Sequence, residues 1–118
     1  RKRGAHLFSK HRYLSAQMSA YLRDDLWLTM ARQANANCAR LADGLRAKGA
    51  TFLHEPQANM IFAQFSRARH KQLHEAGAVY HLWGADLNGA DDEEILACRL
   101  VCDWSISDDD IDRFLALL

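Results

Sequence analysis

The sequence has few of the features that mark membrane-spanning, repetitive or strongly charged proteins. It contains a single proline, Pro56, and no repeat, linker or low-complexity segment. Its apolar runs are all shorter than the roughly 20 residues that a helix needs to cross a bilayer, and no apolar stretch typical of a signal peptide follows the basic start. Fifteen lysines and arginines balance fifteen acidic side chains. We therefore expect one globular domain of 118 residues, with neither nucleic acid nor a membrane as a partner.

Cysteine is also scarce, and none of the three cysteines has the spacing of a metal site. Cys98 and Cys102 are four residues apart. On one strand they would share a face and lie about 13 Å apart, which is too far for a disulfide bond. Because free thiols are typical of a reducing compartment, we expect a cytoplasmic protein.

Two amphipathic helices are predicted in the first part of the chain. Apolar side chains recur at steps of three and four residues from residue 9 to about residue 24, and again from residue 26 to Gly49. Asp24 or Asp25 is placed to cap the second helix, and Gly49 is placed to end it. Two helices joined this tightly predict a helical hairpin.

Beyond Gly49 the apolar pattern changes to the period of two that is typical of strands. The predicted strands cover residues 50–56, 59–65, 78–83 and 95–104, and the predicted helices cover residues 68–77 and 105–118, the last capped by Ser107. The strand at 59–65 is apolar at nearly every position, so both of its faces are expected to be covered. The order ααββαββα predicts an α+β fold: the hairpin, then a small, mainly antiparallel sheet with helices on one face.

An arginine interrupts the otherwise apolar stretch "ILACRLVCDW" at residues 95–104. On a strand, Arg99 lies opposite a face of alternating apolar residues that must point into the core. That predicted core face comprises Leu96, Cys98, Leu100, Cys102 and Trp104. Arg99 is then either a partly exposed arginine that pairs with a nearby acid, or an arginine that the sheet holds in place to bind an anion. Its planar guanidinium matches a carboxylate through two parallel hydrogen bonds.

Three other groups of residues are candidates for chemistry. The first twelve residues, "RKRGAHLFSKHR", are basic, and they form either a solvated helix end or a site for a small phosphorylated ligand. His70 and His74 lie four residues apart on one predicted helix, a spacing that can hold a metal ion, but no third ligand is evident. The acidic residues 91–94, "DDEE", lack the pattern of a calcium loop and are expected to be solvated.

Four stretches of the sequence carry a resemblance to a known family. They are "RKRGAHLFSKHRYLSAQMSAYLRDDLWL", "ARQANANCARLADGL", "QANMIFAQF" and "CRLVCDWSISDDDIDRF". Together they resemble the C-terminal part of the low-specificity threonine aldolases, pyridoxal-phosphate enzymes of fold type I, over essentially the whole chain. The last stretch departs from the family pattern at Cys102, where threonine is usual. The resemblance implies that residues 1–118 are the C-terminal small domain of a longer enzyme, and that residues 1–12 lead in from its large domain.

The resemblance also implies a reaction, a cofactor and site residues. The family cleaves β-hydroxy-α-amino acids such as threonine and allo-threonine to glycine and an aldehyde, with pyridoxal 5′-phosphate as the electron sink. It implies that Arg99 binds the substrate carboxylate. Arg12 and Lys2 are implied as ligands of the cofactor phosphate, with Arg3 and Lys10 as competing assignments. Because the family's Schiff-base lysine lies upstream, no catalytic residue is expected in this chain, which alone should be inactive.

The implied partners are an amino-acid substrate, the large domain, and further subunits of a dimer or tetramer. Two alternatives remain open from the residue pattern. One is a free-standing α+β module, ferredoxin-like in its element order, that binds an anion or a protein without catalysis. The other is a structural domain whose exposed helix faces pack on a partner.

Overall fold

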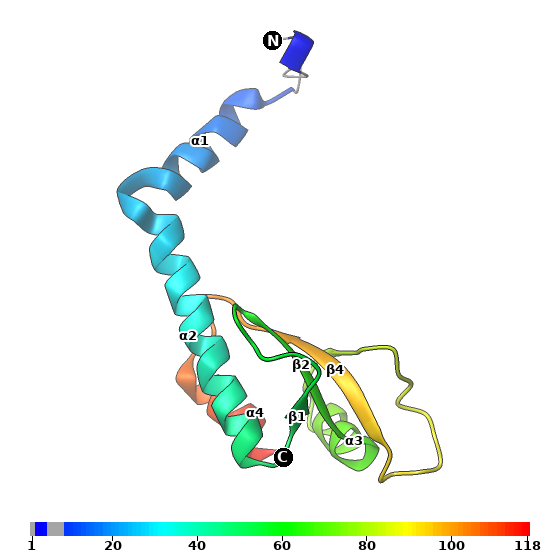
Figure 1. Ribbon diagram of the computed structural model, residues 1–118. Coiled ribbons are helices and arrows are strands. Elements are labelled where there is room, and N and C mark those ends of the chain that lie inside the picture. Colours follow the sequence, from blue (N-terminus) through cyan, green and yellow to red (C-terminus); the bar gives the residue numbers. More distant parts are fainter. Residues whose placement is uncertain (1, 5–8) are drawn as a thin grey trace.

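The predicted succession of helices and strands is found in the protein (Figure 1). The computed structural model describes residues 2–4 and 9–118, apart from the side chain of Lys2. The elements are η1 (Lys2–Gly4), α1 (His11–Leu22), η2 (Arg23–Asp25), α2 (Leu26–Ala47), β1 (Thr51–Phe52), β2 (Met60–Ser66), α3 (Arg67–Glu75), β3 (His81–Leu82), β4 (Ile95–Val101) and α4 (Asp108–Ala116). The α+β class and the order ααββαββα are confirmed. None of the helices described is both long and apolar enough to cross a membrane.

The sheet is antiparallel throughout, with its strands in the spatial order β1-β2-β4-β3. Its centre is the long pair β2 and β4, which runs from Met60 opposite Val101 to Ser66 opposite Ile95. Successive side chains of a strand point to opposite faces, and one face of this pair is buried. The buried face comprises Ile61, Ala63, Phe65, Leu96, Cys98 and Leu100.

Three helices cover this buried face. Leu45 of α2, Leu73 of α3 and Ile111 of α4 belong to the same core cluster as the buried strand residues, and none of the three is more than 1% exposed. Burying a large aliphatic side chain contributes about 1.5–3 kcal/mol, so these contacts dominate the stability of the sheet. The predicted arrangement of helices on one face of the sheet is confirmed.

The helix ends show which local predictions hold. Gly49 and Gly77 follow α2 and α3 with φ of +84° and +94°, the left-handed conformation that glycine adopts most readily at a helix end. Ser107 caps α4 by accepting a hydrogen bond from the backbone N–H of Asp110. Asp25 stands at the N-cap position of α2, but its side chain makes no capping hydrogen bond, so the predicted aspartate cap is wrong.

The second face of the sheet stays open within the described residues. Met60 and Val101 are 40% and 55% exposed, and Phe62, Gln64 and Arg99 are half-buried. The expectation that both faces of the strand at 59–65 are covered is therefore wrong for this chain. The helices that contact the sheet, α2, α3 and α4, pack on the other side.

Trp104 does not belong to the core face predicted for the last strand. The strand ends at Val101, and the tryptophan is 53% exposed. Asp103 redirects the chain, because its Oδ1 accepts hydrogen bonds from the hydroxyl and backbone N–H of Ser105 and from the backbone N–H of Ile106. These donors, with the Ser105 hydroxyl the largest contributor, hold the pKa of Asp103 below its usual value.

The two N-terminal helices meet at a bend and do not pack side by side as the predicted hairpin would. Asp24 and Asp25 both adopt left-handed backbone angles, with φ of +53° and +58°. After this turn α2 runs to the sheet, whereas α1 extends away from it (Figure 1). No residue of α1 is buried. The bend leaves large apolar side chains exposed at Tyr13, Leu14, Met18, Tyr21, Leu22, Leu26 and Trp27.

Candidate functional site

Arg99 lies in the middle of β4, on the open face of the sheet. Its neighbours across the two strand pairs are Phe62 of β2 and His81 of β3. The guanidinium lies over the ring of Trp83, with 5.7 Å between Cζ and the ring centroid. Among the described residues, no acidic side chain forms an ion pair or a hydrogen bond with Arg99. The structure therefore does not support the ion-paired interpretation, and the N–H donors of the guanidinium stay available for an anion.

An aromatic wall surrounds this arginine. The ring of Phe62 meets that of Trp83 edge to face at 5.0 Å, and His54 meets Phe62 in the same manner at 6.0 Å. The backbone N–H of Trp83 donates to the carbonyl of Ala97 at 2.8 Å, so the tryptophan continues the pairing of β3 with β4. Gly84 then turns the chain away with φ of +65°. The sequence analysis did not identify this wall, which only strand pairing assembles.

A buried arginine that the sequence analysis missed anchors the loop after Trp83. Arg67 is 5% exposed, pairs with Glu94 at 2.7 Å, and donates to the carbonyl of Asp91. A Cβ on Gly89 would lie 2.5 Å from its Cζ, so a larger residue at this position would displace the guanidinium. The acidic stretch 91–94 is therefore not merely solvated, since part of it neutralises Arg67. Two features of the sequence could have predicted this ion pair. Arg67 directly follows the apolar stretch at residues 60–66, and the acidic residues 91–94 could neutralise it.

The loop and the open sheet face border an open cavity of about 480 Å³. Gln64, Trp83 and Ala97 line it on the side of the sheet, and Arg67 and Glu94 line it on the side of the loop. Trp83 therefore contacts both this cavity and Arg99, and Arg99 itself is not part of the lining.

The described basic side chains of the N-terminal segment do not join Arg99. Arg12, in the first turn of α1, and its neighbour Lys10 are exposed, as is Arg3. The helix that carries Arg12 extends away from the sheet (Figure 1). The side chain of Lys2 lies outside the described residues. In this chain the predicted carboxylate site and the predicted phosphate ligands are two separate regions.

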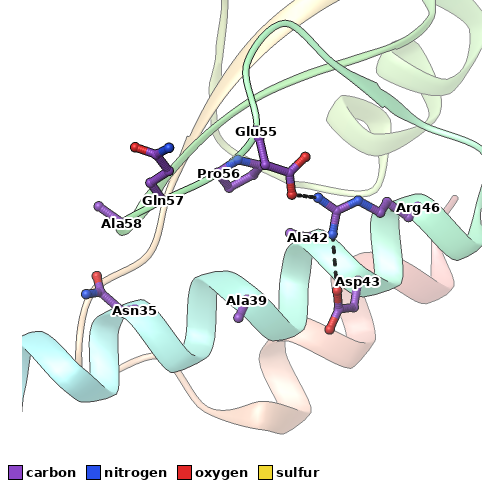
Figure 2. A pocket seen from close by; sticks show the side chains of 9 residues that line it. All are labelled: Asn35, Ala39, Ala42, Asp43, Arg46, Glu55, Pro56, Gln57 and Ala58. Carbon is purple, nitrogen blue, oxygen red and sulfur yellow. Dashed lines mark hydrogen bonds and ion pairs between the residues drawn. The ribbon is translucent and has the colours of Figure 1, made fainter.

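A second groove lies between α2 and the loop at residues 53–59 (Figure 2). Its volume is about 240 Å³, and Ala39, Ala42 and Pro56 supply apolar lining. Arg46 lies at one end, where it pairs with Asp43 at 3.2 Å and with Glu55. Two carboxylates of the groove itself pair with this arginine, so Arg46 is not an unpaired cation for an anionic ligand.

His70 is a core histidine with both ring nitrogens occupied. Its Nε2 donates to the carbonyl of Leu96 at 2.9 Å, and its Nδ1 accepts from the hydroxyl of Tyr80 at 2.8 Å. The ring stacks on Phe65 at 4.0 Å. No group of three metal-binding side chains occurs among residues 2–4 and 9–118. His70 and His74 both pack against the ring of Tyr80. Burial raises the pKa of the Tyr80 hydroxyl.

We expect the stability of the protein to fall as the pH drops below the ordinary histidine pKa of 6.5. Burial, the largest contribution, lowers the pKa of His70 in the folded state. The unfolded chain therefore takes up a proton at a higher pH, and the stability present above pH 6.5 is lost as the pH falls through the folded pKa. Urea unfolding at a series of pH values tests this. His70→Gln, which keeps one donor and one acceptor, should weaken the pH dependence, and an unchanged profile would contradict the assignment.

The fold and the surroundings of Arg99 define a class of protein. It is an α+β domain with one covered sheet face and one open face, and the arginine on the open face has no acidic partner among residues 2–4 and 9–118. Searches against protein families and against curated proteins found no match.

Solved structures do resemble the chain. It is similar to Leishmania major threonine aldolase, with a TM-score of 0.66 and 19% identity over 86% of this chain. It is also similar to Sphingomonas wittichii serine palmitoyltransferase, with a TM-score of 0.55 and 23% identity over 70% of this chain. The chain spans 28% and 21% of the lengths of these two structures. The predicted resemblance to part of the pyridoxal-phosphate enzymes of fold type I is thus confirmed for the fold.

A pyridoxal-phosphate site would need cations for the cofactor phosphate as well as a ligand for the substrate carboxylate. Arg99 has the chemistry to bind a carboxylate. No buried cluster of cations is present among the described residues to hold the phosphate, since Lys10 and Arg12 are exposed on a helix that extends away from the sheet. Lys71 is paired with Asp92 at 2.6 Å. These residues by themselves do not make a cofactor pocket.

Proposed function

We propose that this chain is the small domain of a pyridoxal-phosphate enzyme that acts on amino acids, and that Arg99 binds the substrate carboxylate. The observation that carries the proposal is the guanidinium of Arg99, which is half-buried on the open sheet face and has no acidic partner among the described residues. An arginine fixed on a strand and free of a counter-ion is suited to bidentate binding of a carboxylate. In this proposal the cofactor is held by the large domain, and the enzyme is a dimer or tetramer.

The specific reaction that we propose is the cleavage of threonine or allo-threonine to glycine and an aldehyde. Two points support it. The resemblance to the threonine aldolase structure covers more of this chain, at a higher TM-score, than the resemblance to the palmitoyltransferase. The names of both neighbours also refer to amino acids, threonine and serine, that carry the carboxylate Arg99 would bind. Arg99 then binds and orients the substrate, and it takes no part in proton transfer.

The test is an assay of the full-length protein supplied with pyridoxal phosphate. We expect it to bind the cofactor and to release glycine from threonine, and 1-amino-2-propanol, which lacks the carboxylate, should not compete with threonine. Release of coenzyme A from palmitoyl-coenzyme A and serine, without glycine formation, would instead assign a transferase. A protein that binds no cofactor and forms no glycine would refute the proposal and favour the anion- or protein-binding module.

A further inference from the structure

We infer that Trp83 is a positioning residue that fixes the direction of the Arg99 guanidinium for carboxylate binding. This inference rests on the proposed function of Arg99. An arginine side chain has several rotatable bonds, and ordering them at the moment of binding costs affinity. A contact that orders the side chain in advance removes that cost. The structure contains such a contact in the ring of Trp83.

The partner of Arg99 is a ring and not a carboxylate, and that difference matters for binding. The separation of 5.7 Å between Cζ and the ring centroid lies within the range of cation–π attraction. The attraction acts through the ring face, so it uses none of the guanidinium N–H donors. An acidic partner would hold the arginine equally well, but it would compete with the substrate for those donors. Trp83 therefore orients Arg99 and leaves it free to bind.

The ring of Trp83 is itself held in place. Its backbone N–H donates to Ala97 on β4, the strand that carries Arg99. Its ring packs edge to face on Phe62, which lies directly opposite Arg99 on β2. His54 packs on the far side of Phe62. The backbone bond to β4 and the contact with Phe62 of β2 thus hold the ring, and the ring orients the guanidinium.

The experiment compares tryptophan variants of the full-length protein, loaded with cofactor, by calorimetric titration. The ligands are glycine and ethanolamine, which share the amine, although only glycine has the carboxylate. We expect Trp83→Leu to weaken glycine binding about fivefold, which corresponds to about 1 kcal/mol at 1.4 kcal/mol per tenfold. Binding of ethanolamine should not change. Trp83→Phe, which keeps an aromatic face, should restore glycine affinity to within about twofold.

Trp104→Leu is the matched control, since Trp104 is exposed to a similar degree as Trp83, 53% against 49%, and lies beyond the end of β4. It should leave glycine binding unchanged. In an Arg99→Ala background, Trp83→Leu should cause no further loss, because the tryptophan acts through the arginine. The inference is overturned if Trp83→Leu binds glycine normally, weakens ethanolamine equally, or causes the same loss without Arg99. If Arg99→Ala binds glycine as tightly as the wild type, the proposed function of Arg99 is what fails.

A second measurement covers the case in which Trp83→Leu does not fold. In the wild-type protein the ring current of Trp83 should move the Nε–H proton resonance of Arg99 upfield. The resonance can be assigned by its disappearance in Arg99→Lys. An unshifted resonance would show that the ring does not hold the guanidinium, and would overturn the inference without any tryptophan variant.

Discussion

Under the proposed function, Arg99→Ala in the full-length protein is expected to lower kcat/KM for threonine about 100-fold, because a bidentate, charge-assisted pair with a carboxylate contributes about 3 kcal/mol. The loss should appear mainly in KM, since the carboxylate is bound in the ground state as well as in the transition state. Cofactor binding should persist, because Arg99 has no part in it under the proposal. Steady-state kinetics and the absorbance of bound pyridoxal phosphate measure both quantities.

Two further variants make this result specific. Arg99→Lys keeps the charge but loses the planar fork, so it should recover only part of the affinity. Arg113→Ala removes an arginine whose side chain is 84% exposed and whose ion pair is with Asp110 of the same helix. It should retain wild-type kinetics. If Arg99→Ala kept its KM, or if Arg113→Ala lost as much, Arg99 would not be the carboxylate ligand.

Asn37→Asp is expected to destabilise the folded chain by about 3 kcal/mol, the largest effect that we expect from a single substitution of nearly equal size. Asn37 is 2% exposed, and its Nδ2 donates to the carbonyls of Asp103 at 2.9 Å and Ile106 at 3.1 Å. These two bonds attach the loop between β4 and α4 to α2. An aspartate would place a carboxylate oxygen against two carbonyl oxygens and leave both without a donor. Urea unfolding of the wild type and the variant measures the difference.

Asn35→Asp provides the control, because it makes the same chemical change two residues earlier on an exposed part of α2. It should change the free energy of unfolding by less than about 0.5 kcal/mol. Equal effects of the two substitutions would mean that added charge on α2 causes the loss. The bonds of Asn37 would then have no special importance.

Apolar periodicity was sufficient to predict the elements and the face on which Arg99 lies. Alternation in 95–104 places Leu96, Cys98 and Leu100 on one side of β4 and Arg99 on the other, and burial follows that division. Alternation fails at Trp104, where the hydrogen bonds of Asp103 end the strand geometry. An alternating apolar pattern predicts which residues of a strand face the core. It does not predict the residue at which the strand ends.

The surroundings of Arg99 could not be predicted in the same way. Its contact with Trp83 depends on the register of β3 against β4. That register is set by only two residue pairs, His81 with Arg99 and Leu82 with Cys98. The position of Arg12 depends on Asp24 and Asp25, two consecutive non-glycine residues with positive φ. Such backbone angles are uncommon outside glycine, so no local pattern predicts them. The role proposed for Arg99 comes from the resemblance, and its neighbours come from the structure.

The exposed course of α1 has a consequence for local stability. A helix of 12 residues is marginal by itself in water, and α1 buries none of its side chains in this chain. Its backbone amides should therefore exchange their hydrogens with solvent through local fraying. The amides of β2 and β4 should exchange only when the sheet as a whole unfolds. The protein thus has two parts that differ in stability. The sheet and the helices packed on it unfold as one cooperative unit, whereas the stability of α1 depends on whether its exposed apolar side chains contact another surface.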